Sequence, residues 1–293
     1  MDILTHIADE LARELQRPVG LTASGALGGG SINAAFRLDT SAGRFFVKLN
    51  QERAAEMFAA EAAGLEALAA AKALRIPRPI AHGVADGRAW LVLEHLELNG
   101  PATPARFGEA LAGLHRQTAD AFGWTRDNTI GSTPQRNDRY PEWIDFWREC
   151  RLGQQLRLAE ADGAPRGLLA GGARLLEALP AFFDGYRPRP SLLHGDLWSG
   201  NWGYGPGGEP TIFDPAVYYG DREADVAMTE LFGTPGADFY EAYDAVWPRD
   251  PGYRVRRSLY NLYHILNHHH LFGGGYGSQA ERMISGLLAE VNG

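Results

Sequence analysis

Cysteine is nearly absent from this sequence of 293 residues, because Cys150 is the single one. One thiol cannot form a disulfide within the chain, so we expect a protein of the reducing cytoplasm. Long hydrophobic runs are also missing, since no stretch approaches the roughly 18 apolar residues that a membrane helix needs. The first residues place Ile3, Ile7, Leu11 and Leu15 at helical spacing, which predicts an amphipathic helix and not a signal peptide.

The chain also lacks an excess of basic residues. It has 28 Lys and Arg against 36 Asp and Glu, which gives a net charge of -8. This balance argues against a nucleic-acid or anionic-membrane partner, because both bind basic surfaces. It does not argue against a small anionic ligand, since one local cation and a metal ion can neutralise such a ligand within an acidic protein. We expect a monomer or weak dimer that acts on a small-molecule or protein-bound substrate.

The predicted elements change in kind along the chain. Alternating apolar residues predict a β-hairpin over 34–49, an alanine-rich stretch predicts a helix over 52–71, and 90–93 reads as a buried strand. Beyond that strand the pattern becomes mainly helical. We therefore expect an α+β fold with two lobes, a small β-rich N-lobe of residues 1–95 and a larger, mainly helical C-lobe of residues 96–293.

The sharpest chemical signal is a loop that carries Asp196 and, five residues later, Asn201, followed by a strand that ends in Asp214. Kinases assemble a magnesium phosphoryl-transfer site with this spacing. Asp196 would accept the proton of the attacking hydroxyl, and oxygen atoms of Asn201 and Asp214 would bind Mg²⁺. The plainer alternative is a hairpin whose turn uses Asp, Asn and Gly for their backbone preferences.

A lysine and a glutamate offer a second signal. Lys48 lies on the predicted hairpin, where it could reach the phosphates of ATP. Glu61 falls on the apolar face of the following helix together with Leu65, and a carboxylate there needs a cationic partner. The alternatives are a solvated lysine and a glutamate at the exposed edge of the helix, and Glu56 is the less favoured partner because its own face is nearly all alanine.

Glycines precede the hairpin and form a weaker signal. Backbone N–H groups of a glycine-rich turn can approach phosphates closely, although such turns are common before hairpins. The sequence has no G-x-x-x-x-G-K-[ST] element, so a P-loop NTPase is not supported. The turn consists of Gly28, Gly29, Gly30 and Ser31.

Two aromatic features each allow two interpretations. Trp198 lies inside the loop of Asp196, where it is either a core residue or a platform for the acceptor substrate. His264 and His268 are four residues apart on a predicted helix over 253–272. They could form a metal pair, but no Glu or Cys completes the set at familiar spacing, so packing or substrate contact is favoured.

The sequence resembles the fructosamine-3-kinase, or ketosamine-3-kinase, family, within the aminoglycoside-phosphotransferase and choline-kinase branch of protein-kinase-like folds. The matching stretches run nearly end to end. The most specific are LLHGDLWSGNWG, IFDPAVYYGDREADVAM and LYHILNHHHLFGGGY, and IGSTPQRN and RLGQQL also match. The resemblance implies ATP-dependent phosphorylation of the 3-hydroxyl of ketosamines, a deglycation repair activity, with a preference for ribulosamines over fructosamines.

The resemblance also implies roles for individual residues. Asp196 would be the base, Trp198 and His268 would face the ketosamine, and Asp225 would order the catalytic loop. Asn201 and Asp214 would hold the metal. The ATP-binding set would comprise Gly28, Gly29, Gly30, Ser31, Lys48, Glu61, Glu94, His95 and Leu96, with the last three as hinge contacts to adenine.

Two departures and two rival functions complete the sequence interpretation. Many family members carry a cysteine where this chain has Ser31, so a redox switch of a dimer should be absent. Pro215 replaces the aromatic residue of the protein-kinase Asp-Phe-Gly motif.

The closest rival is a kinase of the same fold for an aminoglycoside, choline or homoserine. A pseudokinase is disfavoured because every expected catalytic position is present.

Overall fold

The computed structural model describes residues 3–27 and 32–292, and its chain divides into two compact units. The first unit comprises residues 1–103 and 203–215, and the second comprises residues 104–202 and 216–293. The return of 203–215 to the first unit has a local cause. Arg75 exchanges backbone hydrogen bonds with this segment, its N–H with Pro210 O at 3.0 Å and its carbonyl with Ile212 N at 3.1 Å.

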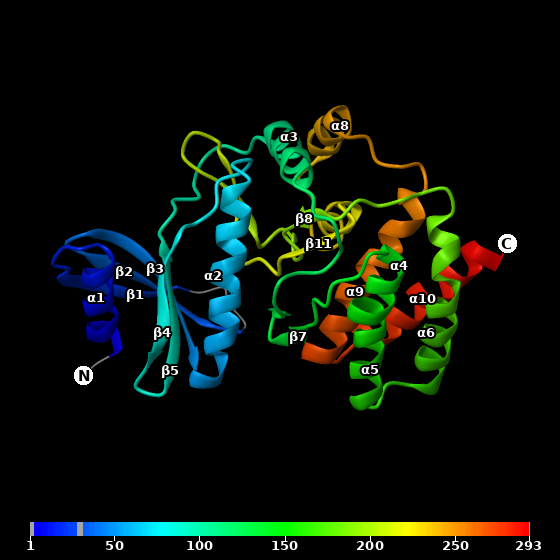
Figure 1. Ribbon diagram of the computed structural model, residues 1–293, viewed down its shortest axis with the longest axis horizontal. Helices are drawn as coiled ribbons and strands as arrows, with labels where there is room; N and C mark the ends of the chain where they lie inside the picture. Colours follow the sequence, from blue (N-terminus) through cyan, green and yellow to red (C-terminus); the bar gives the residue numbers. More distant parts are fainter. Residues whose placement is uncertain (1–2, 28–31, 293) are drawn as a thin grey trace. The chain divides into compact units, whose positions relative to one another are not determined.

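The first unit is built on a five-stranded antiparallel sheet with the order β1-β2-β3-β5-β4 (Figure 1). The predicted hairpin is confirmed as β2 and β3, which are joined by a turn after Thr40. Helix α2 packs on β4 and β5. The elements are α1 (Ile3–Glu14), β1 (Leu21–Leu27), β2 (Ala34–Thr40), β3 (Gly43–Gln51), the 3-10 turn η1 (Glu52–Ala54), α2 (Ala55–Ala70), β4 (Pro79–Ala85), β5 (Arg88–Glu94), β9 (Trp202–Tyr204) and β10 (Pro210–Ile212).

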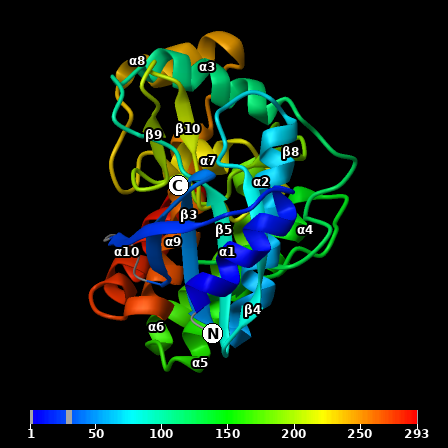
Figure 2. The same ribbon diagram turned by 90° about the vertical axis from the view of Figure 1, so that its left-hand side faces the viewer.

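Alternation along β3 separates the two faces of this sheet. Phe45, Val47 and Leu49 point to one face, where Ile7 and Leu11 of α1 join them in a buried cluster. Figure 2 shows α1 lying over this face of the sheet. Lys48 falls between these residues in the sequence, so its side chain belongs to the opposite face. Helix α1 therefore covers one face of the sheet, and the side chain of Lys48 lies on the other face, toward α2.

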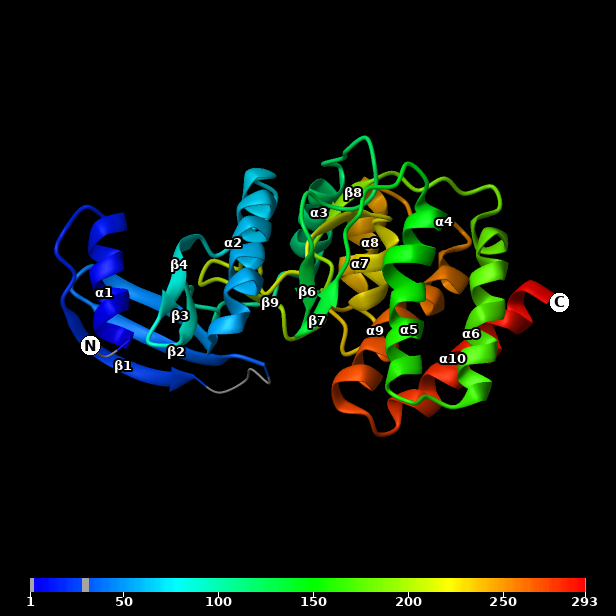
Figure 3. The same ribbon diagram turned by 60° about the horizontal axis from the view of Figure 1, so that its bottom comes forward.

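The second unit is mainly helical. Helices α5, α6, α9 and α10 pack against one another (Figure 3), and α3 packs on α8. The strands β8 and β11 pair with each other, and so do β6 and β7. The elements are α3 (Pro104–His115), β6 (Asn128–Ile130), β7 (Thr133–Gln135), α4 (Trp143–Phe146), the π-helix η2 (Trp147–Leu152), α5 (Gly153–Ala161), α6 (Arg166–Ala178), η3 (Leu179–Phe183), β8 (Ser191–Leu193), β11 (Tyr218–Gly220), α7 (Glu223–Met228), α8 (Ala237–Val246), α9 (Tyr253–Phe272) and α10 (Tyr276–Asn292).

The expected α+β class is confirmed, with a β-rich N-terminal part and a helical C-terminal part. Helix α9 has its predicted limits. The sequence analysis did not identify β1, β4, the β6–β7 hairpin or the π-helix η2. Among the described residues, no helix is long and apolar enough to cross a membrane. The thiol of Cys150 is buried in the π-helix.

Candidate active site

Lys48 is the centre of an ion cluster in the first unit. Its Nζ lies 2.6 Å from Glu61 Oε1 on α2 and 2.6 Å from Asp214 Oδ1, which follows β10. The Lys48 and Glu61 side chains are 6% and 10% exposed, whereas Asp214 is 45% exposed. Glu61 is therefore the α2 carboxylate that the apolar stripe singled out as the partner of the strand lysine. Asp214 is the member of the cluster that a ligand can reach.

The cluster keeps the lysine charged. Burial alone would lower the pKa of Lys48, but the two carboxylates outweigh burial and hold it above its ordinary value. Burial raises the pKa of Glu61, and Lys48 counteracts that rise. A buried ammonium with two carboxylate partners is a strong point charge at a fixed place, which suits phosphate oxygens.

Asp214 has an unusual backbone. Its φ is 57°, in the left-handed region that Asp and Asn tolerate better than most residues. The preceding strand β10 is fixed to Arg75 by the backbone hydrogen bonds described above. The carboxylate is thus set by a strained turn at the end of an anchored strand. Such strain is commonly found at functional sites.

Of the residues expected to contact adenine and the phosphates, the structure describes those at 94–96 but not the glycine turn. Glu94 ends β5, and its N–H already donates to Arg78 O at 2.8 Å, so only its carbonyl could serve a ligand there. Its carboxylate pairs with Arg75. His95 and Leu96 follow as half-buried loop residues. The glycine turn predicted over 28–31 lies outside the described residues.

In the second unit, a buried carboxylate holds the start of the catalytic loop. Asp225 of α7 is 1% exposed and accepts the N–H groups of His194 and Gly195 at 2.7 and 2.8 Å. His115 Nε2 lies 3.3 Å from the same carboxylate, and its Nδ1 lies 2.8 Å from Tyr243 Oη. Burial alone would raise the pKa of Asp225, but these hydrogen bonds hold it below its ordinary value.

Gly195 could not be replaced without moving this loop. Its φ is 83°, and a Cβ there would lie 2.0 Å from the carbonyl oxygen of Ala216. The Ala216 N–H also donates to His194 O at 2.8 Å. Asp225 on one side and the Ala216 backbone on the other therefore fix the residue that precedes Asp196.

Asp196 and Asn201 are joined within the same turn. Asn201 Nδ2 donates to the Asp196 carbonyl at 2.8 Å and lies 3.3 Å from its carboxylate. Trp198, between them, is 39% exposed, and its ring lies so close to Gly200 that a Cβ there would be 2.3 Å away. Trp198 is thus a surface residue and not part of the core. The loop presents a carboxylate and an aromatic ring together.

Helix α9 brings a histidine to this loop. His264 is 6% exposed, and its Nδ1 lies 3.9 Å from Asp196 Oδ1. Burial lowers the pKa of His264 to about 3, so the ring is neutral. His268, one turn later, points its Nδ1 to His264 O at 2.8 Å and packs against Phe232 with ring centroids 4.8 Å apart. Among the described residues, no three or more His, Cys, Asp and Glu side chains are grouped so that they could hold a metal ion.

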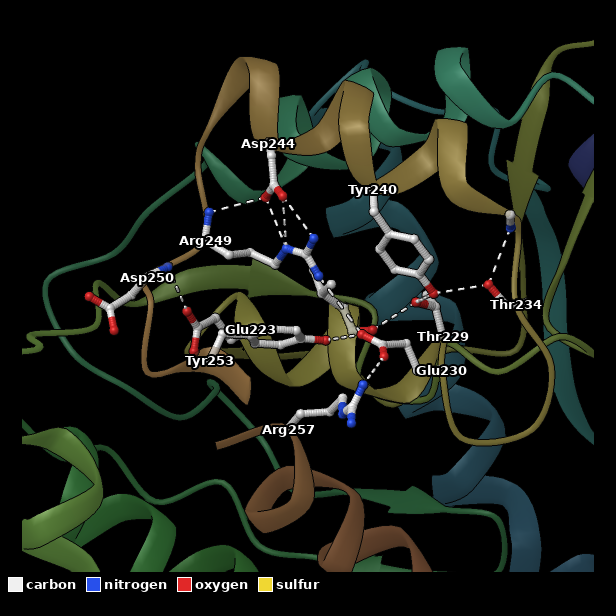
Figure 4. Close-up of polar contacts among 12 residues, drawn as sticks. Glu223, Thr229, Glu230, Thr234, Tyr240, Asp244, Arg249, Asp250, Tyr253 and Arg257 are labelled. Atoms are coloured by element: carbon white, nitrogen blue, oxygen red, sulfur yellow. Dashed lines mark hydrogen bonds and ion pairs between the residues drawn. The ribbon is translucent and has the colours of Figure 1, made fainter. Parts of the chain in front are cut away.

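The loop that follows α7 was not singled out by its sequence, yet it contacts these residues. The hydroxyl of Ser199 donates to Phe232 O, and Gly233 would place a Cβ 2.8 Å from Ser199. Figure 4 shows how polar side chains hold this loop at both ends. Near its start, Tyr253 Oη donates to Glu230 at 2.5 Å and Arg257 donates to the same carboxylate at 2.5 Å. Further along, the hydroxyls of Thr234 and Tyr240 lie 3.2 Å apart. Beyond this loop, Arg249 forms a bidentate pair with Asp244 of α8, from Nε to Oδ1 at 2.9 Å and from Nη2 to Oδ2 at 2.7 Å.

Comparison with known proteins decides the family. A sequence profile described as fructosamine kinase matches residues 3–290. The chain belongs to the fructosamine kinase family. A relative in Synechocystis, named a probable ketoamine kinase, is 46% identical over 96% of both chains. The chloroplastic protein-ribulosamine 3-kinase of Arabidopsis thaliana is 43% identical over 92% of this chain and 83% of its own.

Solved structures agree with this assignment. The crystal structure of a protein from Haemophilus somnus, provisionally named a fructosamine-3-kinase, matches with a TM-score of 0.88 at 29% identity over 96% of both chains. A crystal structure of an aminoglycoside phosphotransferase matches with a TM-score of 0.66 at 16% identity, over 98% of this chain and 99% of its own, which shows the shared kinase-like fold.

Within this fructosamine kinase family member, sequence reasoning missed His115 and did not say which of the two α9 histidines lies beside the catalytic loop. His264, rather than His268, lies beside Asp196. The four-residue spacing of the two histidines marked the helix face but could not say which member reaches the loop. His115, under Asp225, carried no signal, because a lone histidine near a helix end is usually a packing residue.

Proposed function

We propose that this chain is an ATP-dependent kinase that phosphorylates the 3-hydroxyl of ketosamines. The acceptors would be ribulosamine and fructosamine adducts of amines or protein lysines, so the activity is a deglycation repair. The family match supports the reaction class, and the Arabidopsis relative named a protein-ribulosamine 3-kinase supports a preference for ribulosamines. The observation that carries the proposal is Asp196, a carboxylate on a loop whose backbone is fixed from both sides.

Asp196 would accept the proton of the attacking hydroxyl. Its side chain is 22% exposed, so a hydroxyl can reach it, and Asn201 holds its backbone carbonyl. Proton acceptance by a positioned carboxylate needs little motion when the loop is already fixed. His264 stays neutral at 3.9 Å and offers a hydrogen-bonding nitrogen to a substrate hydroxyl without adding a competing charge.

Lys48 would position the phosphates of ATP. In the described arrangement its ammonium binds Glu61 and Asp214, and a phosphate oxygen would join or replace the Asp214 contact, since Asp214 is the exposed partner. Glu61 would remain and hold the lysine in place. Gly28, Gly29, Gly30 and Ser31 would cover the phosphates, and the backbone of Glu94, His95 and Leu96 would meet adenine.

The residues present fit a magnesium ion. Mg²⁺ prefers hard oxygen ligands and often takes one or two protein groups plus substrate phosphates. Asp214 offers a half-exposed carboxylate and Asn201 an amide oxygen, so the donor chemistry is suitable. When bound, Mg²⁺ would neutralise charge on the triphosphate. Asn201 and Asp214 are the residues that would hold it.

Trp198 and His268 would form the acceptor side. The exposed indole of Trp198 offers a flat face for the sugar or amine portion of a ketosamine. His268 is held by the rings of Phe232 and Tyr276 and by the carbonyl of His264, so its position is fixed before substrate arrives. A site of this kind orients the acceptor without further rearrangement.

A panel of acceptors tests the reaction. The purified chain is incubated with ATP, Mg²⁺ and, separately, a ribulosamine, a fructosamine, an aminoglycoside, choline and homoserine, and ATP consumption and phosphorus resonances are followed. We expect turnover with the two ketosamines, fastest with the ribulosamine, and a 3-phosphate that decays with release of the amine. Turnover only with an aminoglycoside, choline or homoserine would overturn the substrate assignment.

The role of Asp196 has its own test. Asp196→Ala should lower kcat for the ketosamine by roughly 10²–10⁴ and leave ATP affinity within about twofold. Asp184→Ala, at an exposed carboxylate outside the catalytic loop, is the matched control and should leave kcat unchanged. Unchanged turnover in Asp196→Ala would remove this residue from catalysis.

A further inference from the structure

The short β6–β7 hairpin of the second unit has buried polar side chains that the proposed reaction does not use. Gln135, at the end of β7, is 1% exposed. Its amide nitrogen donates to Ala216 O at 3.1 Å and to Asn128 Oδ1 at 2.8 Å. Its amide oxygen accepts the hydroxyl of Tyr263 at 2.6 Å. One side chain therefore joins helix α9 to the segment that follows Asp214.

The hairpin contacts α9 on both sides of His264. Tyr263 bonds Gln135, as above, and Asn267, one turn later, donates to Ile130 O at 3.4 Å. Gln155 of α5 donates to Asn267 Oδ1, also at 3.4 Å. The helix segment that carries His264 and leads to His268 is thus fixed to the hairpin at two points one turn apart.

The same hairpin contacts the backbone that supports the catalytic loop. Asn128 Nδ2 donates to Val217 O at 2.8 Å, and Gln135 bonds the carbonyl of Ala216. Ala216 in turn donates its N–H to His194 O, and its carbonyl oxygen is the atom that leaves no room for a side chain at Gly195. A shift of the hairpin would therefore reach the residues that precede Asp196.

A buried guanidinium binds the two residues that follow the hairpin. Arg151, in the π-helix, is 0% exposed, and its Nη2 donates to Asn137 Oδ1 at 2.7 Å while its Nη1 donates to Arg136 O at 2.6 Å. Its carbon Cζ lies 3.9 Å from the ring centroid of Tyr218, whose strand β11 pairs with β8. π-helical turns often occur at functional sites. This one places the Arg151 guanidinium against the segment that follows the hairpin and over the ring of Tyr218.

We propose that the β6–β7 hairpin, through Gln135, positions α9 against the catalytic loop and so sets how His264 and His268 meet an acceptor bound at Asp196. Gln135 and Tyr263 are positioning residues, since they act through the histidines and the loop backbone. The bonds of Gln135 to Tyr263 and to the Ala216 carbonyl are buried, where hydrogen bonds are strong and an unpaired group is costly, so the hairpin has one preferred register. The inference rests on the proposed ketosamine kinase function for its kinetic readout.

Tyr263→Phe is the main test, because it removes only the hydroxyl that donates to Gln135 and keeps the ring. We expect the KM for the ketosamine to rise about tenfold, because a small displacement of an orienting group strongly weakens a productive complex, while the KM for ATP stays within about twofold. Tyr260→Phe is the matched control. Tyr260 also lies on α9 and donates its hydroxyl to a buried carboxylate, that of Asp221 at 2.5 Å. The Tyr260→Phe variant should lower the free energy of unfolding without changing the KM for the acceptor.

Hydrogen exchange gives a readout that needs no substrate. In Tyr263→Phe, the amides of 194–197 and of 263–269 should both exchange faster, whereas in Tyr260→Phe those of 194–197 should keep their wild-type rates. Equal KM changes in the two variants, or unchanged exchange at 194–197 in Tyr263→Phe, would overturn the positioning role. A wild-type chain without ketosamine turnover would refute the proposed function instead, and the exchange result would still decide this inference.

Discussion

The two units hold their functional side chains in different ways. In the first, the Lys48 ammonium is held by attraction to the charged side chains of Glu61 and Asp214. In the second, Asp196 is placed by its backbone, because Asp225 binds the two preceding N–H groups and Ala216 packs behind them. The difference matches the work proposed for each site. A charged side chain can exchange one partner for a phosphate, whereas a catalytic base benefits from a support that does not change.

Removing Asp225, which supports the backbone before Asp196, should destabilise the protein more than removing a charge from the Lys48 cluster. Asp225→Ala would leave two buried N–H groups and the ring of His115 without their acceptor, so we expect the free energy of unfolding to fall by about 4 kcal/mol. Urea denaturation of the wild type and the variant measures this difference in the free energy of unfolding. Glu241→Ala, at an exposed residue of α8, is the control and should change stability by less than about 0.5 kcal/mol. A loss below about 1 kcal/mol for Asp225→Ala would show that the loop does not depend on this carboxylate.

The ion cluster should tolerate loss of one charge somewhat better. Lys48→Met leaves Glu61 buried without its cation, but burial already raises the pKa of Glu61, so the carboxyl can take up a proton. We expect a loss of about 3 kcal/mol at neutral pH, at the low end for breaking a buried pair. Equilibrium denaturation of the purified variant gives the value.

A second substitution separates charge from packing in this cluster. Lys48→Met combined with Glu61→Gln removes both members of the buried pair and should recover at least about 1 kcal/mol of the loss. A double variant that is less stable than Lys48→Met would mean that shape, and not charge, holds the cluster. The contrast between the two units would then be much weaker than proposed.

The smallest expected effect concerns the neutral histidine beside Asp196. Because burial lowers the pKa of His264 to about 3, the unfolded chain binds more protons than the native one between that value and about 6.5. Well above pH 6.5 the imidazole is neutral in both states and costs no stability. As the pH falls below that value, the unfolded chain takes up a proton that the native ring does not, and the free energy of unfolding declines. At pH 5.5 the loss should be about 1.4 kcal/mol relative to pH 7.5.

The His264 contribution is isolated by difference. The change in unfolding free energy between pH 7.5 and 5.5 is measured for the wild type and for His264→Gln, and the variant should lose about 1.4 kcal/mol less. His82→Gln, at an exposed histidine of β4, should behave like the wild type. Equal pH dependence in His264→Gln would mean that the native ring takes up a proton, with Asp196 as the nearest anion.

The contact between Lys48 and Glu61 could be predicted from sequence because both ends leave a local pattern. Strand alternation sets the face of Lys48, and helical periodicity places Glu61 on the apolar stripe of α2. A buried carboxylate demands a cation, so the pair follows from two short stretches. The spacing of Asp196 and Asn201 is also local, and both lie in one turn of the structure.

The supports of the catalytic loop were harder to predict, because they join residues far apart in the chain. His115 and Asp225 are 110 positions apart, and Tyr263 and Gln135 are 128 apart. Strands β6 and β7 have three residues each, too few for alternation to be visible. The π-helix at 147–152 keeps an ordinary helical composition, so nothing local marks its wider turn.

The buried thiol of Cys150 makes this chain a convenient background for site-specific probes. Burial raises the pKa of Cys150, so the thiol is both enclosed and protonated, and it should resist maleimides under native conditions. A cysteine introduced at one exposed position would then carry a fluorophore or spin label alone. Reporters placed near Trp198 or Asp214 could follow acceptor and nucleotide separately, without first removing any native residue.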